Sequence, residues 1–195
     1  MWVPHRLCRQ DEWVNRYQYR LSFSRAEIVL LNSWMPVQQI VYHVLRSFMK
    51  TERLTDITDS TGSEILSNYN IKTLMLWASE IKGRSWWIDE MNVVGICVKL
   101  LHILGVWLTD ARCPHYLTNN CNLFDCLDNS YLTQNTANRL MSVTEAWLAE
   151  WFVNNYIRKC TAYPCCSACP DKVSRLFDDI STHVKLTTES CFSAC

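Results

Sequence analysis

Hydrophobic residues recur along most of this chain at spacings of three and four, which is the period of an α-helix with one buried face. One short segment alternates apolar and polar residues instead, as a half-buried strand does. The pattern therefore predicts a mainly α-helical fold, a multi-helix lobe of about six helices with one N-terminal strand. The predicted helices cover residues 26–34, 36–48, 68–81, 89–108, 134–158 and 172–180.

The predicted helices differ in how much of their surface they bury. Val93–Leu108 is apolar nearly all round, so we expect it to lie at the centre of the fold, with His102 as a core residue. Lys99 and His102 make this segment too polar, and its length too short, for a membrane span. The other long helices are amphipathic, and their predicted buried faces are Val37, Ile40, Val41, Val44, Leu45 and Phe48; Ile71, Leu74, Met75, Ala78 and Ile81; and Leu140, Met141, Thr144, Trp147, Leu148 and Trp151.

The predicted strand, Tyr17–Phe23, runs directly into a helix. The next four residues, Ser24 to Glu27, fit a capping box, in which a serine and a glutamate three residues later satisfy the first amides of a helix. A strand is not stable alone, because its backbone groups need hydrogen-bond partners. Either this strand pairs with part of residues 1–16, or the sheet to which it belongs lies outside this chain.

Composition limits the possible functions. The 195 residues include 19 basic and 19 acidic ones, so net charge gives no support to binding of nucleic acid or of an anionic membrane. We find no secretory signal and no membrane span in the sequence. Eleven cysteines, an odd number, occur without a glycosylation sequon. These features favour reduced thiols in a cytoplasmic protein over a disulfide framework.

Cysteines gather in the last part of the chain, which we separate from the rest. We predict an irregular N-terminal segment over 1–16, a helical lobe over 17–158, and a cysteine-rich C-terminal extension with a short helix over 159–195. Reduced thiols without metal are the favoured interpretation of the extension, because no second Cys-x2-Cys pair is present. The alternative is a zinc site, whose candidate ligands are Cys160, Cys165, Cys166 and Cys169, with Cys191, Cys195 or His183 completing the set.

Three longer motifs occur in order along the chain. They are "YRLSFSRAE" from Tyr19, "LSNYNIKTLMLWASE" from Leu66 and "CPHYLTNNCNLFD" from Cys113. Over about residues 17–128 they resemble the C-terminal half of the male-abnormal-21-like (Mab-21-like) family, which includes cyclic GMP-AMP synthase and cGAS-like receptors. The resemblance implies that the strand is a late strand of a nucleotidyltransferase sheet. It also implies that the following helices form a second lobe, with the active cleft between the two lobes.

The resemblance implies nucleotide-binding roles for four residues of this chain. Arg20, Ser22 and Ser24 match positions that face the nucleotide, and Tyr69 matches a tyrosine that stacks on the base. Other roles stay open: Ser24 is also a predicted helix cap, and Tyr69 also fits a core or interface position. His115, in the third motif, is expected to order its own loop.

The chain also departs from the family's pattern. The lysine expected to hold a triphosphate is Gln39, and the second serine before the tyrosine is Asn68. The family holds its metal with acids at i and i+2 of one strand, whereas no acidic residue here is followed by another two positions later. The only Gly-Ser pair, Gly62-Ser63, precedes no metal-binding strand. We therefore expect no catalytic residues and no cofactor in this chain, whereas a complete relative would use magnesium or manganese.

Two functional hypotheses follow. In the first, the chain is a non-catalytic helical lobe, part of a nucleotide-second-messenger synthase of innate immunity, that binds nucleotide weakly or not at all and pairs with an N-terminal catalytic lobe. In the second, it is a helical protein–protein interaction module with no nucleotide role. In either case an unpaired apolar edge at Tyr17–Phe23 would favour self-association. No membrane partner is expected.

The zinc hypothesis gives a first testable prediction. If the extension binds zinc, replacing Cys166 and Cys169 together removes the metal and loosens the chain beyond Arg158, while the helices before it keep their stability. Metal analysis of purified protein measures the zinc content, and replacement of Cys8 is the control. Well under one zinc per chain in the unaltered protein contradicts the hypothesis.

Overall fold

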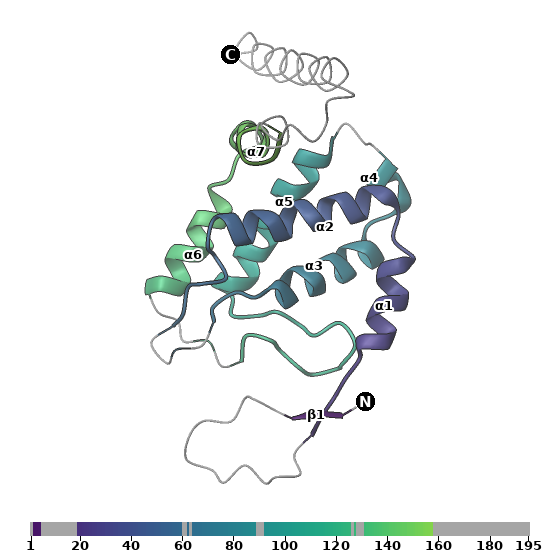
Figure 1. The fold of residues 1–195 in the computed structure, drawn as a ribbon. Coiled ribbons are helices and arrows are strands. Elements are labelled where there is room, and N and C mark those ends of the chain that lie inside the picture. Colours follow the sequence, from purple (N-terminus) through teal and green to yellow (C-terminus); the bar gives the residue numbers. More distant parts are fainter. Residues whose placement is uncertain are drawn as a thin grey trace, which may run out of the picture.

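The computed structural model describes residues 2–4, 19–59, 62, 64–88, 92–125, 127 and 131–157. Within these residues the chain forms a two-stranded ribbon and seven α-helices, the last of which continues as a π-helical turn (Figure 1). The prediction of a mainly helical fold is confirmed. The cysteine-rich extension and its predicted helix lie outside the described residues.

The N-terminal strand has a partner. β2, Tyr19–Leu21, pairs antiparallel with β1, Trp2–Pro4, and Val3 lies opposite Arg20. The first of the two alternatives is therefore correct, since the partner of the strand comes from the first 16 residues. Residues near the start of the chain supply the hydrogen-bond partners that a strand needs, so the expected unpaired edge has a neighbouring strand on one side.

The helices over 24–32, 36–51, 68–81, 93–109 and 131–141 begin within four residues of their predicted starts, whereas the short helix over 84–88 was not predicted. Pro36 opens α2, because its fixed φ and missing N–H suit the first turn of a helix. Ser67 precedes α3, and its backbone N–H donates to the Asn70 side chain at 2.7 Å. The helix bounds are α1 Ser24–Asn32, α2 Pro36–Thr51, α3 Asn68–Ile81, α4 Arg84–Ile88, α5 Val93–Thr109, α6 Tyr131–Met141 and α7 Glu145–Phe152, followed by the π-helical turn Val153–Ile157.

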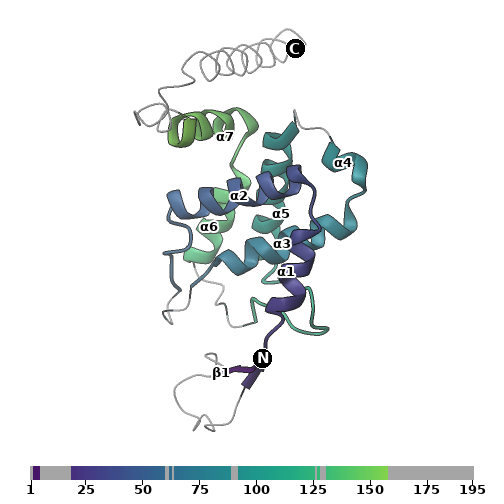
Figure 2. The ribbon, with the colours of Figure 1, turned by 45° about the vertical axis from the view of Figure 1, so that its right-hand side comes forward.

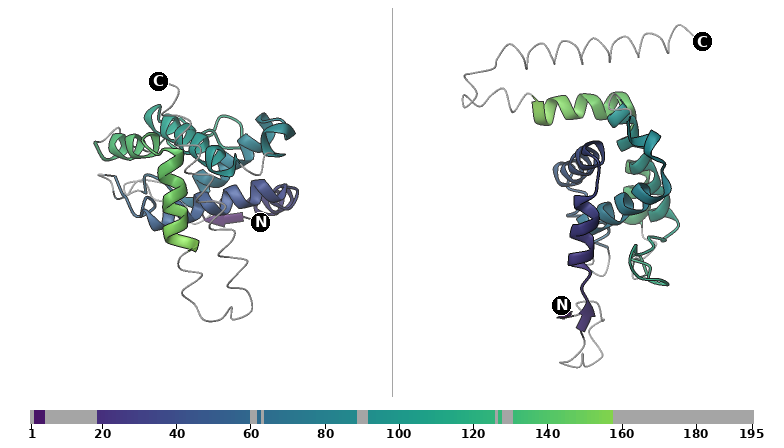
Figure 3. Two further views of the ribbon diagram at one scale, coloured as in Figure 1. Left: turned by 90° about the horizontal axis from the view of Figure 1, so that it is seen from above. Right: turned by 90° about the vertical axis from the view of Figure 1, so that its right-hand side faces the viewer.

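Helix α5 forms the centre of the lobe, as its nearly uniform hydrophobicity predicts. It contacts α2, α3, α6 and α7, which lie next to it in the views of Figure 2 and Figure 3. Even α5 is not long and apolar enough to cross a bilayer, and the same holds for every helix in the described part of the chain. Its buried residues are Gly95, Ile96, Cys97, Val98, Leu100, Leu101, Leu104, Gly105 and Leu108.

The predicted buried faces of the helices are confirmed along the middle of each apolar stripe, and they are wrong at its edges. Ile40 and Ile81 are 50% and 69% exposed, and Met141 and Trp147 are 37% and 44% exposed. The positions that point most directly at α5 are fully buried, including Val41 in α2. A helix buries a stripe, and residues at the edge of the stripe are covered only if a neighbour lies beside them.

The prediction of one long C-terminal helix is also wrong, because the chain breaks between α6 and α7. Thr144 caps α7, with its side-chain oxygen accepting from the Trp147 N–H at 3.3 Å. His102 of α5 lies with Nε2 2.9 Å from the carbonyl oxygen of Val143, within the break. The break turns α7 across α2 (Figure 3). The ring centres of Phe48 and Trp147 lie 6.1 Å apart where the two helices meet. His102 is half-buried, and it joins α5 to this turn.

Close packing of α5 on α6 gives a second prediction. A Cβ at Gly105 would lie 2.7 Å from Met141 Cγ and 3.1 Å from the carbonyl oxygen of Ala137. Gly105→Val should therefore destabilise the lobe by about 3 kcal/mol, measured by denaturant unfolding. The control is Gly83→Val, where the nearest atom is 3.9 Å away. Equal losses for the two variants would contradict the close packing.

Candidate functional site

Polar side chains gather where α1, α3 and the loop after α5 meet. The loop over residues 111–125 passes beneath α3 toward the N-terminal end of α1 (Figure 1). Glu27 comes from α1, Tyr69 and Lys72 come from the first turns of α3, and His115 comes from the loop. These four residues, called the Tyr69 cluster below, lie at the end of the lobe where the chain enters from β2.

An ion pair lies at the centre of the Tyr69 cluster. Lys72 Nζ is 2.6 Å from Glu27 Oε2, and the two side chains are only 18% and 11% exposed. The hydroxyl of Tyr69 donates to the other carboxylate oxygen of Glu27 at 3.0 Å. The Lys72 ammonium also lies 4.4 Å from the centre of the Tyr69 ring, a cation–π distance. The tyrosine is therefore fixed through both its hydroxyl and its ring.

The hydrogen bonds of His115 have a defined direction. The backbone N–H of Leu117 donates to His115 Nδ1 at 3.1 Å, which places the proton of the neutral ring on Nε2. Nε2 lies 2.8 Å from the Tyr69 hydroxyl, which in turn donates to Glu27. His115 thus orders its own loop, as predicted, and also links this loop to α3 and α1.

The loop itself is held at several points. Asn122 donates to the carbonyl oxygen of Ala111 at 2.8 Å and accepts from the backbone N–H of Cys113 at 2.7 Å. From α3, the indole N–H of Trp77 donates to the carbonyl oxygen of Pro114 at 2.9 Å. The irregular, Asn-rich sequence of this loop is therefore compatible with a fixed position for His115.

Three of the four predicted nucleotide-binding residues lie at or beside the Tyr69 cluster. The hydroxyls of Ser22 and Ser24 are hydrogen-bonded to each other. Between them in sequence, Phe23 packs its ring 5.8 Å from the ring of His115. Tyr69 is half-buried, so the structure is compatible both with a platform for a base and with an interface position. Arg20 lies in β2, and its side chain is outside the described residues.

The capping box predicted for Ser24 and Glu27 is wrong. Phe23 is the N-cap of α1 and Ser24 is already helical, so Glu27 turns to Lys72 instead. A buried ion pair with added hydrogen bonds satisfies the carboxylate better than an exposed helix end does. The pair joins the only acid of α1 to the only cation of α3, but the sequence alone does not show that these two helices meet.

Other candidate groups have structural roles. The side chain of Gln39, at the expected lysine position, donates to the carbonyl oxygen of Trp34 at 3.2 Å. Burial raises the pKa of Cys97 to about 12 and that of Cys113 to about 11, so both thiols are protonated at neutral pH. No group of three potential metal ligands occurs within the described ranges, and the candidate zinc ligands Cys160 to Cys169 lie outside them.

Together these features define a helical lobe built around one buried helix, with a polar cluster at the end where the chain enters. The Mab-21 protein HhH/H2TH-like domain matches residues 37–142, more than half of the chain, and the chain belongs to the Mab-21 family. The matched range includes Tyr69, Lys72 and His115, whereas Glu27 and the two serines precede it. Comparison with curated proteins found no match.

The ion pair gives a third prediction. Lys72→Met leaves the Glu27 carboxylate largely buried without its cation, so the free energy of unfolding should fall by roughly 3 kcal/mol. Glu27→Gln combined with Lys72→Met should lose less than the sum of the single changes, since neither charge is then left alone. Lys99→Met, at an exposed position of α5, is the control. Additive losses in urea unfolding would show that the pair does not interact.

Proposed function

We propose that the chain is a non-catalytic helical lobe, and that the end containing the Tyr69 cluster forms one wall of a nucleotide cleft. A separate nucleotidyltransferase lobe would complete the cleft and supply the catalytic groups. The observation on which this proposal rests is that the fixed ring of Tyr69 and the hydroxyls of Ser22 and Ser24 lie at the same end of the lobe. Membership of the Mab-21 family supports it, as does the resemblance of the three sequence motifs to nucleotidyltransferases of this family.

The chemistry of the cluster suits recognition of a nucleotide. Lys72 lies over the half-buried ring of Tyr69, and the centre of the His115 ring lies 5.7 Å from its centre, so a base would stack on the part of the ring that these two side chains leave uncovered. Base stacking on an aromatic side chain contributes about 1–3 kcal/mol. The ring is held by Lys72 and by two hydrogen bonds, so little conformational entropy would be lost on binding. The hydroxyls of Ser22 and Ser24, which are hydrogen-bonded to each other, would exchange this bond for bonds to a ligand, because each is both a donor and an acceptor.

The same residues do not suffice for nucleotidyl transfer. Attack on an α-phosphate places charge on oxygens that metal ions held by clustered carboxylates normally stabilise. The sequence has no acid pair at i and i+2, and Gln39 replaces the lysine expected to hold the triphosphate. We infer that any nucleotide-second-messenger synthesis in which this lobe participates, including a role in cytoplasmic innate immunity, depends on the second lobe.

A role as a protein-interaction module is the second candidate. On α1, Ile28 and Val29 are 55% and 69% exposed, one turn from Ser24. Two adjacent exposed aliphatic side chains beside a polar cluster are typical of a surface that another lobe or protein covers. This surface is compatible with both functions, since the catalytic lobe itself would be such a partner.

The proposal predicts no product and weak binding for this chain alone. Incubation with labelled ATP and GTP, magnesium or manganese, and double-stranded DNA or RNA should yield no dinucleotide. Nucleotide titration followed by NMR should show a Kd of roughly millimolar order. Tyr69→Ala should abolish this binding, whereas Tyr131→Ala, at an 81% exposed tyrosine of α6, should not.

Two results would contradict this proposal. A cyclic or linear dinucleotide whose formation is lost on changing an acidic residue would reveal an active site within the chain. Nucleotide binding that is the same in the Tyr69→Ala and Tyr131→Ala variants would remove the role of the cluster, and would leave the interaction module as the better-supported function.

A further inference from the structure

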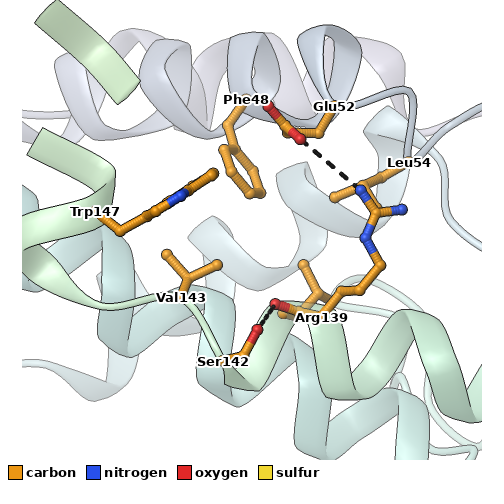
Figure 4. A pocket seen from close by; sticks show the side chains of 8 residues that line it. Phe48, Glu52, Leu54, Arg139, Ser142, Val143 and Trp147 are labelled. Atoms are coloured by element: carbon orange, nitrogen blue, oxygen red, sulfur yellow. Dashed lines mark hydrogen bonds and ion pairs between the residues drawn. The ribbon is translucent and has the colours of Figure 1, made fainter. Parts of the chain in front are cut away.

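A pocket of about 330 Å³ lies on another part of the lobe, between the C-terminal ends of α2 and α6 and the start of α7. Its volume is at the lower end of the range for small-molecule sites. Figure 4 shows that one side of the pocket is apolar, whereas the carboxylate of Glu52 and the guanidinium of Arg139 face each other on the other side. The lining residues are Phe48, Glu52, Leu54, Arg139, Leu140, Ser142, Val143 and Trp147.

The apolar side suits a flat ring. Phe48 is 3% exposed and Val143 is 7% exposed, so both are fixed by the core behind them. Trp147 is 44% exposed and meets Phe48 edge to face, with an angle of 89° between the ring planes. A planar apolar ligand that covers Trp147 and Val143 would remove exposed hydrophobic surface from water.

The polar side has unused hydrogen-bonding capacity. Glu52 accepts from the indole N–H of Trp151 through Oε1 at 2.7 Å, which fixes the carboxylate. Its Oε2 lies 3.8 Å from a terminal nitrogen of Arg139, which is an ion pair but too long for a hydrogen bond. One carboxylate oxygen can therefore accept, and the guanidinium of Arg139 can donate, side by side at the edge of the pocket (Figure 4).

We propose that this pocket binds a small neutral molecule with one flat apolar ring and a carboxamide-like edge. The amide carbonyl would accept from Arg139, and the amide N–H would donate to Glu52 Oε2. The charges at this edge cancel, so a neutral donor–acceptor pair satisfies both groups. A carboxylate in the same place would face Glu52, and an ammonium would face Arg139, which in each case adds repulsion between like charges.

Three probes with the same ring and different edges test this proposal. Benzamide, benzoate and benzylamine are titrated into the full chain, and binding is measured by saturation-transfer NMR of the probes. Benzamide should bind about tenfold more tightly than either charged probe, a difference of about 1.4 kcal/mol. Equal affinities, a preference for a charged probe, or no binding of benzamide would each overturn the proposal.

Replacing each of the two charged residues should change which probe binds most tightly, and the two replacements should favour probes of opposite charge. Glu52→Gln keeps an acceptor for Trp151 and removes the negative charge, so benzoate should become the tightest ligand through Arg139. Arg139→Leu should instead favour benzylamine, through Glu52. Arg84→Leu, at an exposed position of α4 that does not line the pocket, should leave benzamide preferred. An unchanged order in the first two variants would show that binding occurs elsewhere.

Discussion

The burial of α5 is the constraint on which the rest of the lobe depends. A helix that is apolar on almost every side is unstable in water, so other elements must cover most of its surface. α2, α3, α6 and α7 supply this cover, and each needs only one apolar stripe to do so. Gly105 allows α6 to approach closely, since any larger residue there would meet the backbone at Ala137. The amphipathic helices are thus arranged around a partner that exposes only a narrow strip, at Lys99 and Val106.

Local chemistry made the starts of α2 and α3 predictable from the sequence. Pro36 and Ser67 act through the residues next to them, so no knowledge of the fold is needed to place these helix starts. The break after α6 is different, because Thr144 fits the interior of an amphipathic pattern equally well. Two interactions favour the break: the packing of α7 against α2, and the contact between His102 and Val143. Both join parts of the chain that are far apart in sequence.

The candidate site shows the same division. Tyr69 and Ser22 were placed by resemblance to a family, and the structure brings their segments to one end of the lobe. The role of Glu27 could not be predicted, because a capping box and a buried ion pair begin from the same short motif. Glu27 forms the ion pair because Lys72, 45 residues later, lies beside it in the fold. The sequence does not show that two residues so far apart in the chain are in contact. The pairing of the strand with residues 2–4 likewise needed coordinates.

The bond between Trp151 and Glu52 also bears on how the lobe assembles. It joins residues that are 99 positions apart and so closes a loop that contains most of the described chain. Closing a long loop costs conformational entropy. Contacts between segments that are neighbours in sequence do not compensate for this cost. Helix α7 packs on α5 and also meets the end of α2, through Phe48 and Glu52, so both of these helices hold it in place. We therefore expect the docking of α7, which depends on contacts far apart in sequence, to follow the packing of the helices on which it lies.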